Sequence, residues 1–221
     1  MPGDPMKDNK KPTILVSSTV YGFEELLELI YTLLTRMEYE VWMSHKGTIP
    51  INPNFSAFEN CLAATEKCDL FLGIITPFYG SGKNNEDDLS ITHQELTRAI
   101  ELNKPRWLLV HDHVVFTRSF LDHLRLNGEK IDRRLLSVEK NPEFGHLRVL
   151  EMFETAANLD SNKPLEDRTG NWVQKFQSDA DASLFAIAQF SRYHEVEKFL
   201  KENLRDKSRV SRAVKGKEDS A

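Results

Sequence analysis

The run DLFLGII, residues 69–75, decides the fold, because every residue after the aspartate is apolar or glycine. Such a run is typical of a strand that is covered on both faces of a parallel sheet. Three similar runs predict further strands: TILVSS (13–18), YEVWMS (39–44) and RWLLVH (106–111). Apolar side chains recur at helical spacing between them. This alternation of strand and helix predicts an α/β doubly wound parallel sheet with right-handed crossovers.

The segments between and after these strands predict the remaining elements. Amphipathic patterns indicate helices over 23–37, 55–65 and 91–103. After residue 111 the rhythm changes, and the expected order is a helix over 117–126, a helix over 145–158, a fifth strand WVQKFQ (172–177) and a long final helix over 180–204. The part after residue 112 is therefore predicted to be a helical extension whose one late strand completes the same sheet.

Composition limits the class of protein. The 221 residues are 40% hydrophobic and 29% charged, which argues against a chain that is disordered or embedded in a membrane. No apolar stretch is typical of a signal peptide or a membrane span, so we expect a cytoplasmic protein with no membrane partner. The predicted organisation is a flexible leader (1–12), a single α/β domain (13–204) and a charged tail (205–221).

Charge and cysteine content narrow the class further. The net charge of −5 argues against a generally basic nucleic-acid binder, but the tail alone carries six basic and three acidic residues. Contact of this tail with nucleic acid is therefore kept as one hypothesis. Cys61 and Cys68 lie seven residues apart, in a predicted helix that runs up to the next strand. This is too far for a disulfide, so both are expected to be buried small apolar residues.

The fold predicts where a ligand would bind. In open α/β sheets the ligand crevice lies beyond the carboxyl ends of the strands, which here are followed by the loops 17–22, 76–82 and 111–113. Hydroxyls and glycines beside a helix N-terminus suit a phosphate or a ribose. We therefore expect a sugar and phosphate site lined by Ser17, Ser18, Thr19, Tyr79 and Gly80. Helix capping explains Ser18 and Thr19 equally well.

Sequence fingerprints of common nucleotide sites and hydrolases are missing. The chain has no GxGxxG and no GxxxxGK[ST], which argues against a dinucleotide fingerprint and a P-loop. It has no GxSxG either, so a serine hydrolase triad has no support. His111, Asp112 and His113 suggest a metal site, but alternating residues at a strand end point to opposite faces, so we expect neither a metal nor a cofactor.

Glu95 is the candidate catalytic residue. It lies in ITHQELTRAIELNKP, near the start of the helix that follows the long third loop, where a carboxylate faces the predicted crevice. Thr92-x-x-Glu95 is also a capping box, in which Glu95 would reach back to the Thr92 amide. If Ser90 caps the helix instead, Glu95 lies one turn deeper and this structural explanation fails.

Three segments together resemble a known bacterial family. They are ILVSSTVYGFEELLELIYTLL (14–34), KCDLFLGIITPFYG (67–80) and SITHQELTRAIELNKP (90–105). Over about residues 13–112 the chain is similar to the family called domain of unknown function 4062, which is related to TIR domains and nucleoside deoxyribosyltransferases. The resemblance implies a flavodoxin-like sheet with strand order 2-1-3-4-5.

The resemblance also implies a chemistry. In the deoxyribosyltransferase and TIR relatives, a glutamate at the start of the helix after this loop attacks, or stabilises charge at, the anomeric carbon of a nucleoside or NAD. Glu95 is the matching residue, and Thr92 matches as well. The chain departs from the deoxyribosyltransferase pattern at Leu89, Ile91 and Thr97, which favours hydrolysis, or no catalysis at all, over transfer between nucleosides.

Two functional hypotheses follow. The first is a nucleotide-processing domain that cleaves an N-glycosidic bond in NAD, a nucleotide or a nucleoside; the resemblance implies a role in antiphage or stress defence. The second is a non-catalytic module that senses a nucleotide or contacts a partner protein. It is favoured by Ile91 and Thr97, where the deoxyribosyltransferase pattern has glycines, and by the acidic residues 86–88. Whether the chain forms a homo-oligomer or needs an activating partner is left open.

Overall fold

The protein folds around one five-stranded parallel sheet. The computed structural model describes residues 11–82, 88–126, 128–133, 136, 144–157 and 171–193. The strand order is β2-β1-β3-β4-β7. The strands are β1 (Thr13–Ser18), β2 (Glu40–Trp42), β3 (Leu70–Ile75), β4 (Arg106–His111) and β7 (Val173–Phe176). The fold class and the order of the five strands are those predicted from the sequence, and the arrangement is flavodoxin-like.

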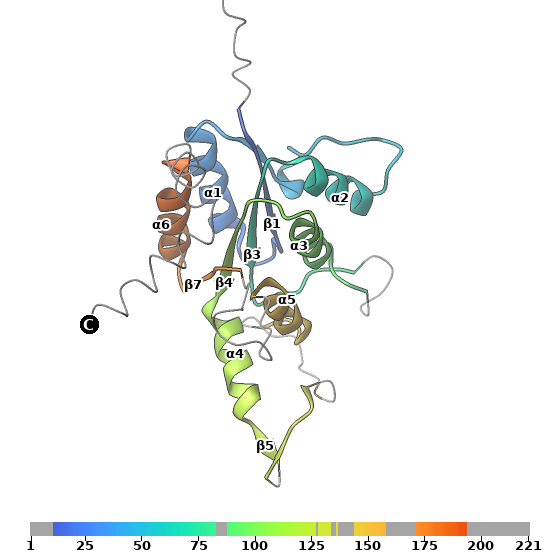
Figure 1. Ribbon diagram of the computed structural model, residues 1–221, viewed down its shortest axis with the longest axis vertical. Coiled ribbons are helices and arrows are strands. Elements are labelled where there is room, and N and C mark those ends of the chain that lie inside the picture. Colours follow the sequence, from blue (N-terminus) through green and yellow to red (C-terminus); the bar gives the residue numbers. More distant parts are fainter. Residues whose placement is uncertain are drawn as a thin grey trace, which may run out of the picture.

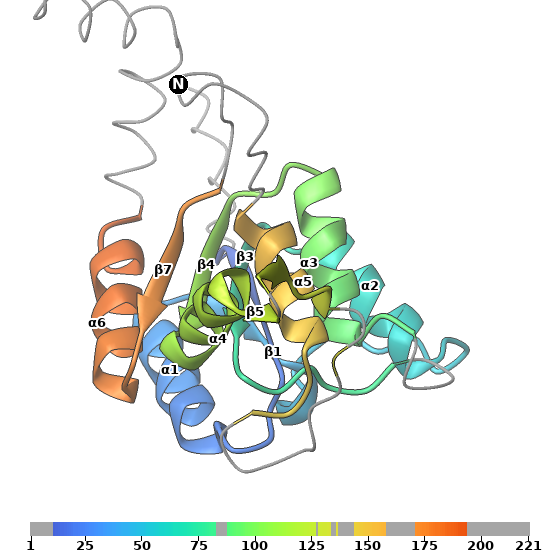
Figure 2. The same ribbon diagram turned by 90° about the horizontal axis from the view of Figure 1, so that it is seen from below.

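Helices cover both faces of the sheet (Figure 1, Figure 2). On one face lie α1 (Glu24–Arg36) and α6 (Asp179–Phe190), which we call the α1/α6 face. On the other lie α2 (Ala57–Lys67), α3 (Ile91–Glu101) and α5 (Arg148–Ala157), which we call the α2/α3/α5 face. A short 3-10 helix, η1 (Ser44–Lys46), follows β2.

The alternation of β1 side chains shows how the two faces differ. Ile14 and Val16 point into the apolar cluster of the α1/α6 face. Leu15 packs in the cluster of the opposite face, and Ser17, two residues on, bonds to a side chain of α3. β3 lies at the centre and is buried along its whole length, as its uniformly apolar sequence predicts.

The late strand completes the sheet as expected. β7 pairs with β4 in parallel, with Leu108 opposite Val173 and His111 opposite Phe176. The helices predicted over 145–158 and 180–204 correspond to α5 and α6, although α6 ends at Phe190. Within the part after residue 112, β7 therefore joins the sheet, and α5 and α6 join its two helical layers.

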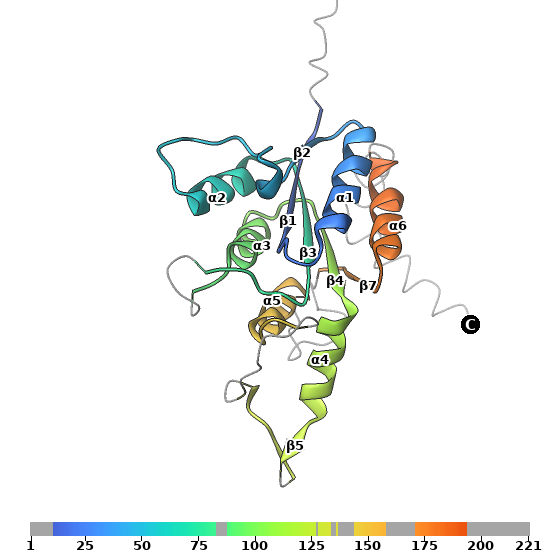
Figure 3. The same ribbon diagram turned by 180° about the vertical axis from the view of Figure 1, so that it is seen from behind.

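The helix predicted over 117–126 is wrong at both ends. α4 runs from Asp112 to His123, because His111 ends β4 and at once caps α4: its side chain accepts a hydrogen bond from the His113 backbone N–H. Residues 125–126 are β5, which pairs with β6 (Glu129–Lys130), and Gly128 has the positive φ of 86° that a tight turn favours. α4 and this small hairpin extend away from the sheet (Figure 1, Figure 3).

Several predicted segments lie outside the described residues. They are most of the leader (1–12), the acidic residues 86 and 87, the end of the final helix (194–204) and the charged tail (205–221). In the part of the chain that the structure describes, no helix combines the length and the apolar character that crossing a membrane requires.

Candidate functional site

A buried carboxyl is paired with a serine at the carboxyl end of β1. The Ser17 hydroxyl donates to Oε2 of Glu95 over 2.5 Å, and both side chains are buried. β1 supplies Ser17, because alternation turns it toward α3, and the second turn of α3 supplies Glu95. Such a short bond to a carboxyl oxygen is typical of a charge-assisted hydrogen bond.

The N-terminus of α3 places Glu95 there, and the capping box predicted for Thr92 is wrong. Ser90 caps the helix: its side chain accepts from the His93 backbone N–H at 3.3 Å. The helix therefore begins at Ile91, two residues before a Thr92 cap would allow. Glu95 therefore lies two residues beyond the position of a capping glutamate, and it points to β1 instead of folding back on Thr92. The contact with Ser17 is thus not a by-product of helix capping.

The environment of Glu95 changes its ionisation. Burial raises the pKa of Glu95 to about 7, although hydrogen bonds from the side chains of Ser17 and Cys61 oppose this shift. Cys61 comes from α2, and burial together with the nearby carboxylate raises the pKa of its thiol to about 12. At neutral pH Glu95 is therefore poised between its acid and its carboxylate, while Cys61 remains a thiol and is not a nucleophile.

Both cysteines are free and buried, as the sequence predicts. Burial also raises the pKa of Cys68, to about 11, and its thiol donates to the Thr65 carbonyl oxygen. Neither cysteine is a reactive thiol in this structure.

The loops after β1 and β3 meet at the N-terminus of α3. A Cβ at Gly80 would lie 3.1 Å from Oγ1 of Thr19 and 3.7 Å from Cβ of Ser90, and Gly80 has a φ of +81°. We call this contact of Thr19, Gly80 and Ser90 the seam. The Thr19 Oγ1 is buried there, and none of the described residues offers it a hydrogen-bond partner. Glycine is needed because the two loops approach closely and because the backbone is left-handed.

A second polar cluster lies beside the seam. The Tyr79 hydroxyl is 2.8 Å from Nδ1 of His93, and Nε2 of His93 is 3.3 Å from the hydroxyl of Thr155 on α5. Burial, aided by the charge of Arg148, lowers the pKa of His93 to about 4, so this imidazole is neutral at physiological pH. Tyr79 is buried as well, and burial raises the pKa of its hydroxyl.

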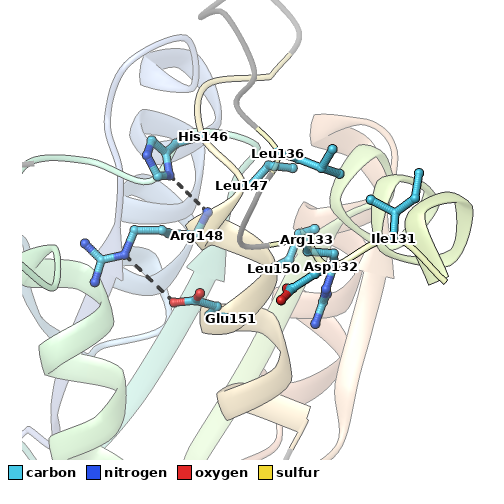
Figure 4. Close-up of a pocket in the computed structure, with 9 residues that line it drawn as sticks. All are labelled: Ile131, Asp132, Arg133, Leu136, His146, Leu147, Arg148, Leu150 and Glu151. Atoms are coloured by element: carbon cyan, nitrogen blue, oxygen red, sulfur yellow. Dashed lines mark hydrogen bonds and ion pairs between the residues drawn. The ribbon is translucent and has the colours of Figure 1, made fainter. Parts of the chain in front are cut away.

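The segment that leads into α5 packs on this cluster. The Gly145 N–H donates to the Pro77 carbonyl at 3.0 Å, and the Arg148 guanidinium lies over the Tyr79 ring at 5.1 Å. A pocket of about 630 Å³ adjoins it, with Arg148 and Glu151 in its wall and 3.8 Å between their charged groups (Figure 4). The chain after residue 144 therefore closes the α3 side of the predicted site.

An open crevice lies on the other side of the same loops. It has a volume of about 480 Å³ and is lined by Tyr21, Gly22, Phe23, Glu24, Pro77, Phe78, His111 and His113. These residues follow the carboxyl ends of β1, β3 and β4, as the rule for open α/β sheets predicts. Neither Glu95 nor the five residues predicted to line the sugar and phosphate site, Ser17, Ser18, Thr19, Tyr79 and Gly80, line this crevice. The open crevice and the buried carboxyl are thus two separate features of one sheet edge.

His111 and His113 line this crevice, and Asp112 groups with them. Their alternation was predicted to turn them to opposite faces, and this prediction is wrong because the chain leaves the strand after His111 and enters α4. One ligand atom from each of the three lies within 4.8 Å of the others. The His111 and His113 rings are 4.6 Å apart. Burial, more than the nearby His113, lowers the pKa of His111.

The structure brings some of the predicted site residues together and separates others. Ser17 meets Glu95, and Thr19 meets Gly80. Tyr79 meets His93, which the sequence did not single out. Ser18 and Thr92 take no part in these contacts: the Ser18 hydroxyl lies 3.1 Å from the carbonyl of Thr19, and Thr92 is buried without capping α3.

Cys61, His93 and Arg148 are the residues that sequence reasoning missed. They come from α2, α3 and α5 and meet Glu95 or Tyr79 only in the fold. Only His93 could have been found from the local sequence, because it is a histidine in the first turn of the helix that carries Glu95.

These observations define a flavodoxin-like α/β domain with a buried serine–carboxyl pair at the carboxyl edge of its sheet. The sequence matches the model of the family described as a domain of unknown function (DUF4062) over residues 13–133, more than half of the chain. The chain belongs to this family. No curated protein matches it.

Proposed function

We propose that this domain binds a nucleotide or nucleoside at the carboxyl edge of its sheet and cleaves the N-glycosidic bond, with Glu95 as the acting carboxylate. The contact between Glu95 and Ser17 carries the proposal, since it holds an ionisable group beneath the loops where this fold binds ligands. A buried carboxyl with a pKa near 7, and with no charged partner among the residues that the structure describes, is a costly arrangement for a purely structural residue.

The proposed reaction is a hydrolysis. The bond between the anomeric carbon and the base nitrogen breaks, and the base leaves with the electron pair and takes up a proton. The Glu95 carboxylate stabilises the positive charge that develops on the sugar, or forms a glycosyl ester that water then hydrolyses. The oxygen of water ends on the anomeric carbon. Ser17 fixes the orientation of the carboxyl group, while its hydrogen bond favours the ionised form.

Glu95 is only 5% exposed, so a substrate reaches it only after the covering chain has moved, and we infer that the seam is the part that opens. Two loops meet at the seam, and loops move more readily than strands or helices. The unpaired Thr19 hydroxyl supports ligand binding there, since a buried hydroxyl without a partner is unfavourable unless a ligand group completes its hydrogen bonds. We infer that the sugar hydroxyls of the substrate separate Thr19 from Gly80.

A non-catalytic nucleotide-binding module is the second candidate. It is favoured by the closed seam and by the position of Glu95 outside the open crevice. Such a module would bind a nucleotide in the crevice, where the exposed Tyr21 ring would contact the base. Thermal shift across a nucleotide panel, followed by mass spectrometry of the products, separates the two: binding without released base supports the module.

The test of the enzyme is release of free base from NAD, NADP and a panel of nucleosides and nucleotides. The full chain is compared with Glu95→Gln, which keeps the shape of the side chain and removes its charge. Glu101→Gln is the matched control, because Glu101 lies at the exposed end of the same helix and pairs with Arg98 there. Wild type and Glu101→Gln should release base, and Glu95→Gln should release none.

Circular dichroism of each variant should match that of the wild type, which checks that the fold is retained. Base release by Glu95→Gln at the wild-type rate would remove Glu95 from the mechanism. No base release from any substrate, together with a thermal shift by one of them, would leave the non-catalytic module as the function of the fold.

A further inference from the structure

We propose that His111, Asp112 and His113 form a binding site for a divalent first-row transition metal ion, with Zn²⁺ as the reference ion, at the mouth of the open crevice. The three residues are consecutive and sit at the junction of β4 and α4. The proposal does not depend on the function assigned to Glu95, because it concerns the opposite side of the loops.

The spacing of the ligand atoms suits a metal ion. Nδ1 of His111 lies 3.3 Å from Oδ1 of Asp112, and one ligand atom of each residue lies within 4.8 Å of the others. Zinc binds imidazole nitrogen and carboxylate oxygen at about 2.0–2.2 Å in tetrahedral geometry, which places two ligands roughly 3.3 Å apart. The pair of His111 and Asp112 already has this separation, and rotation of the exposed His113 side chain brings in the third ligand.

Neighbouring residues hold the first two ligands in place. Gln177 donates through Nε2 to Oδ2 of Asp112 at 2.7 Å, so that Oδ1 is the oxygen turned to His111. The His111 ring packs edge-on against Phe23 and Phe176, with centroids 5.5 and 5.2 Å away. A carboxylate fixed by an amide and an imidazole fixed by packing are the outer contacts that orient metal ligands in proteins.

The lone pair on His111 is only weakly engaged. Nδ1 accepts from the His113 backbone N–H at 3.2 Å, at the long end of the range for such a bond. This N–H lies in the first turn of α4, where backbone donors have no helical partner and water satisfies them readily. A metal ion at Nδ1 therefore replaces the N-cap hydrogen bond of α4 and gains a nitrogen ligand.

The donor set indicates the class of ion. Two imidazoles with one carboxylate suit Zn²⁺, Fe²⁺ and related ions, whereas Mg²⁺ and Ca²⁺ prefer oxygen ligands alone. Three protein ligands leave at least one coordination position open. Since both histidines line the crevice, that position faces it, and Glu24 in the same lining adds negative charge that attracts a cation.

The test is zinc binding to the full-length, untagged chain after removal of metal by a chelator and dialysis. Isothermal titration should show one Zn²⁺ per chain, and Co²⁺ should give the visible absorption of a nitrogen-coordinated site. His113→Ala, at an exposed position, should weaken binding at least about tenfold. Gln177→Ala, which removes only the group that orients Asp112, should weaken it about 10- to 100-fold.

His123→Ala is the matched control, because His123 is exposed at the opposite end of the same helix. It should bind zinc as the wild type does. Two results would overturn the proposal. One is the absence of stoichiometric binding in the wild type, and the other is binding that His113→Ala leaves unchanged or that His123→Ala abolishes. His113→Ala should also lose the zinc-dependent rise in Tm that the wild type shows.

Discussion

The two faces of the sheet bury different kinds of side chain. On the α1/α6 face the buried side chains form an apolar cluster, and the buried Ser183 satisfies its hydroxyl within its own helix, on the Asp179 carbonyl at 2.6 Å. On the α2/α3/α5 face the apolar cluster surrounds a buried carboxyl, a thiol and a neutral imidazole. The first face is suited to stability, while the second carries buried polar groups that cost stability and are typical of functional sites.

The largest effect on stability is expected from a substitution in the apolar cluster of the α1/α6 face. Phe190 is 2% exposed, and the centroid of its ring lies 4.8 Å from that of Trp107 and 5.7 Å from that of Tyr39. Phe190→Ala should lower the free energy of unfolding by about 3–5 kcal/mol, because it leaves a cavity in a packed cluster. Leu184→Ala, at an exposed position of the same helix, should change it by less than about 0.5 kcal/mol. Urea unfolding measures both, and equal effects would contradict the assignment of α6 to the core.

On the α2/α3/α5 face we expect a smaller effect on stability, one that depends on pH. The pKa of Glu95 rises from its ordinary value of 4.5 to about 7 on folding, so the folded state holds its proton more tightly than the unfolded state does. Glu95 therefore makes the protein less stable as the pH rises from 4.5 to 7, by roughly 3 kcal/mol in total, with no further loss above 7.

Glu95→Gln cannot lose a proton and should escape this decline. Relative to the wild type, the variant should gain stability steadily between pH 4.5 and 7, and the gain should level off at higher pH. Urea unfolding at several pH values measures the difference. A constant difference across this range would show that Glu95 titrates normally, and that its burial does not shift its pKa.

The smallest expected effects on stability come from two buried serines, one on each face of the sheet. Ser17→Ala removes a donor from a carboxylate and should cost about 1.5–3 kcal/mol at pH 8, where Glu95 is ionised, and less at pH 5. Ser183→Ala removes a hydroxyl that bonds its own helix, and alanine favours helix, so the change should stay within about 0.5 kcal/mol. Similar costs for both serines would mean that the two faces do not differ in this respect.

The sequence predicts the fold well because the strands are short apolar runs with clear ends. β1, β3 and β4 follow the runs at 13–18, 69–75 and 106–111 to within one residue. The start of α4 was missed because His111, Asp112 and His113 were interpreted as a strand end, whereas side-chain capping by His111 starts the helix at once. Nothing in the local pattern distinguishes these two outcomes.

The candidate site was predicted only in part. The pairing of Ser17 with Glu95 was accessible, because the carboxyl edge of the sheet and the helix after β3 must lie together. The depth of Glu95 was not, since it depends on which of two hydroxyl residues caps α3. Cys61 and Arg148 could not be found, because their segments show only apolar periodicity and reach the site through long-range packing.

The measurement that most directly tests the central claim, catalysis by the Glu95 carboxylate, is the pH profile of kcat/KM for base release. This ratio reports the ionisation of the free protein. Because Glu95 acts in its ionised form, kcat/KM should rise about tenfold per pH unit below the pKa near 7 and level off above it. A value of kcat/KM that stays constant from about pH 5.5 to about pH 8.5 would contradict the claim that the buried carboxylate of Glu95 performs the chemistry.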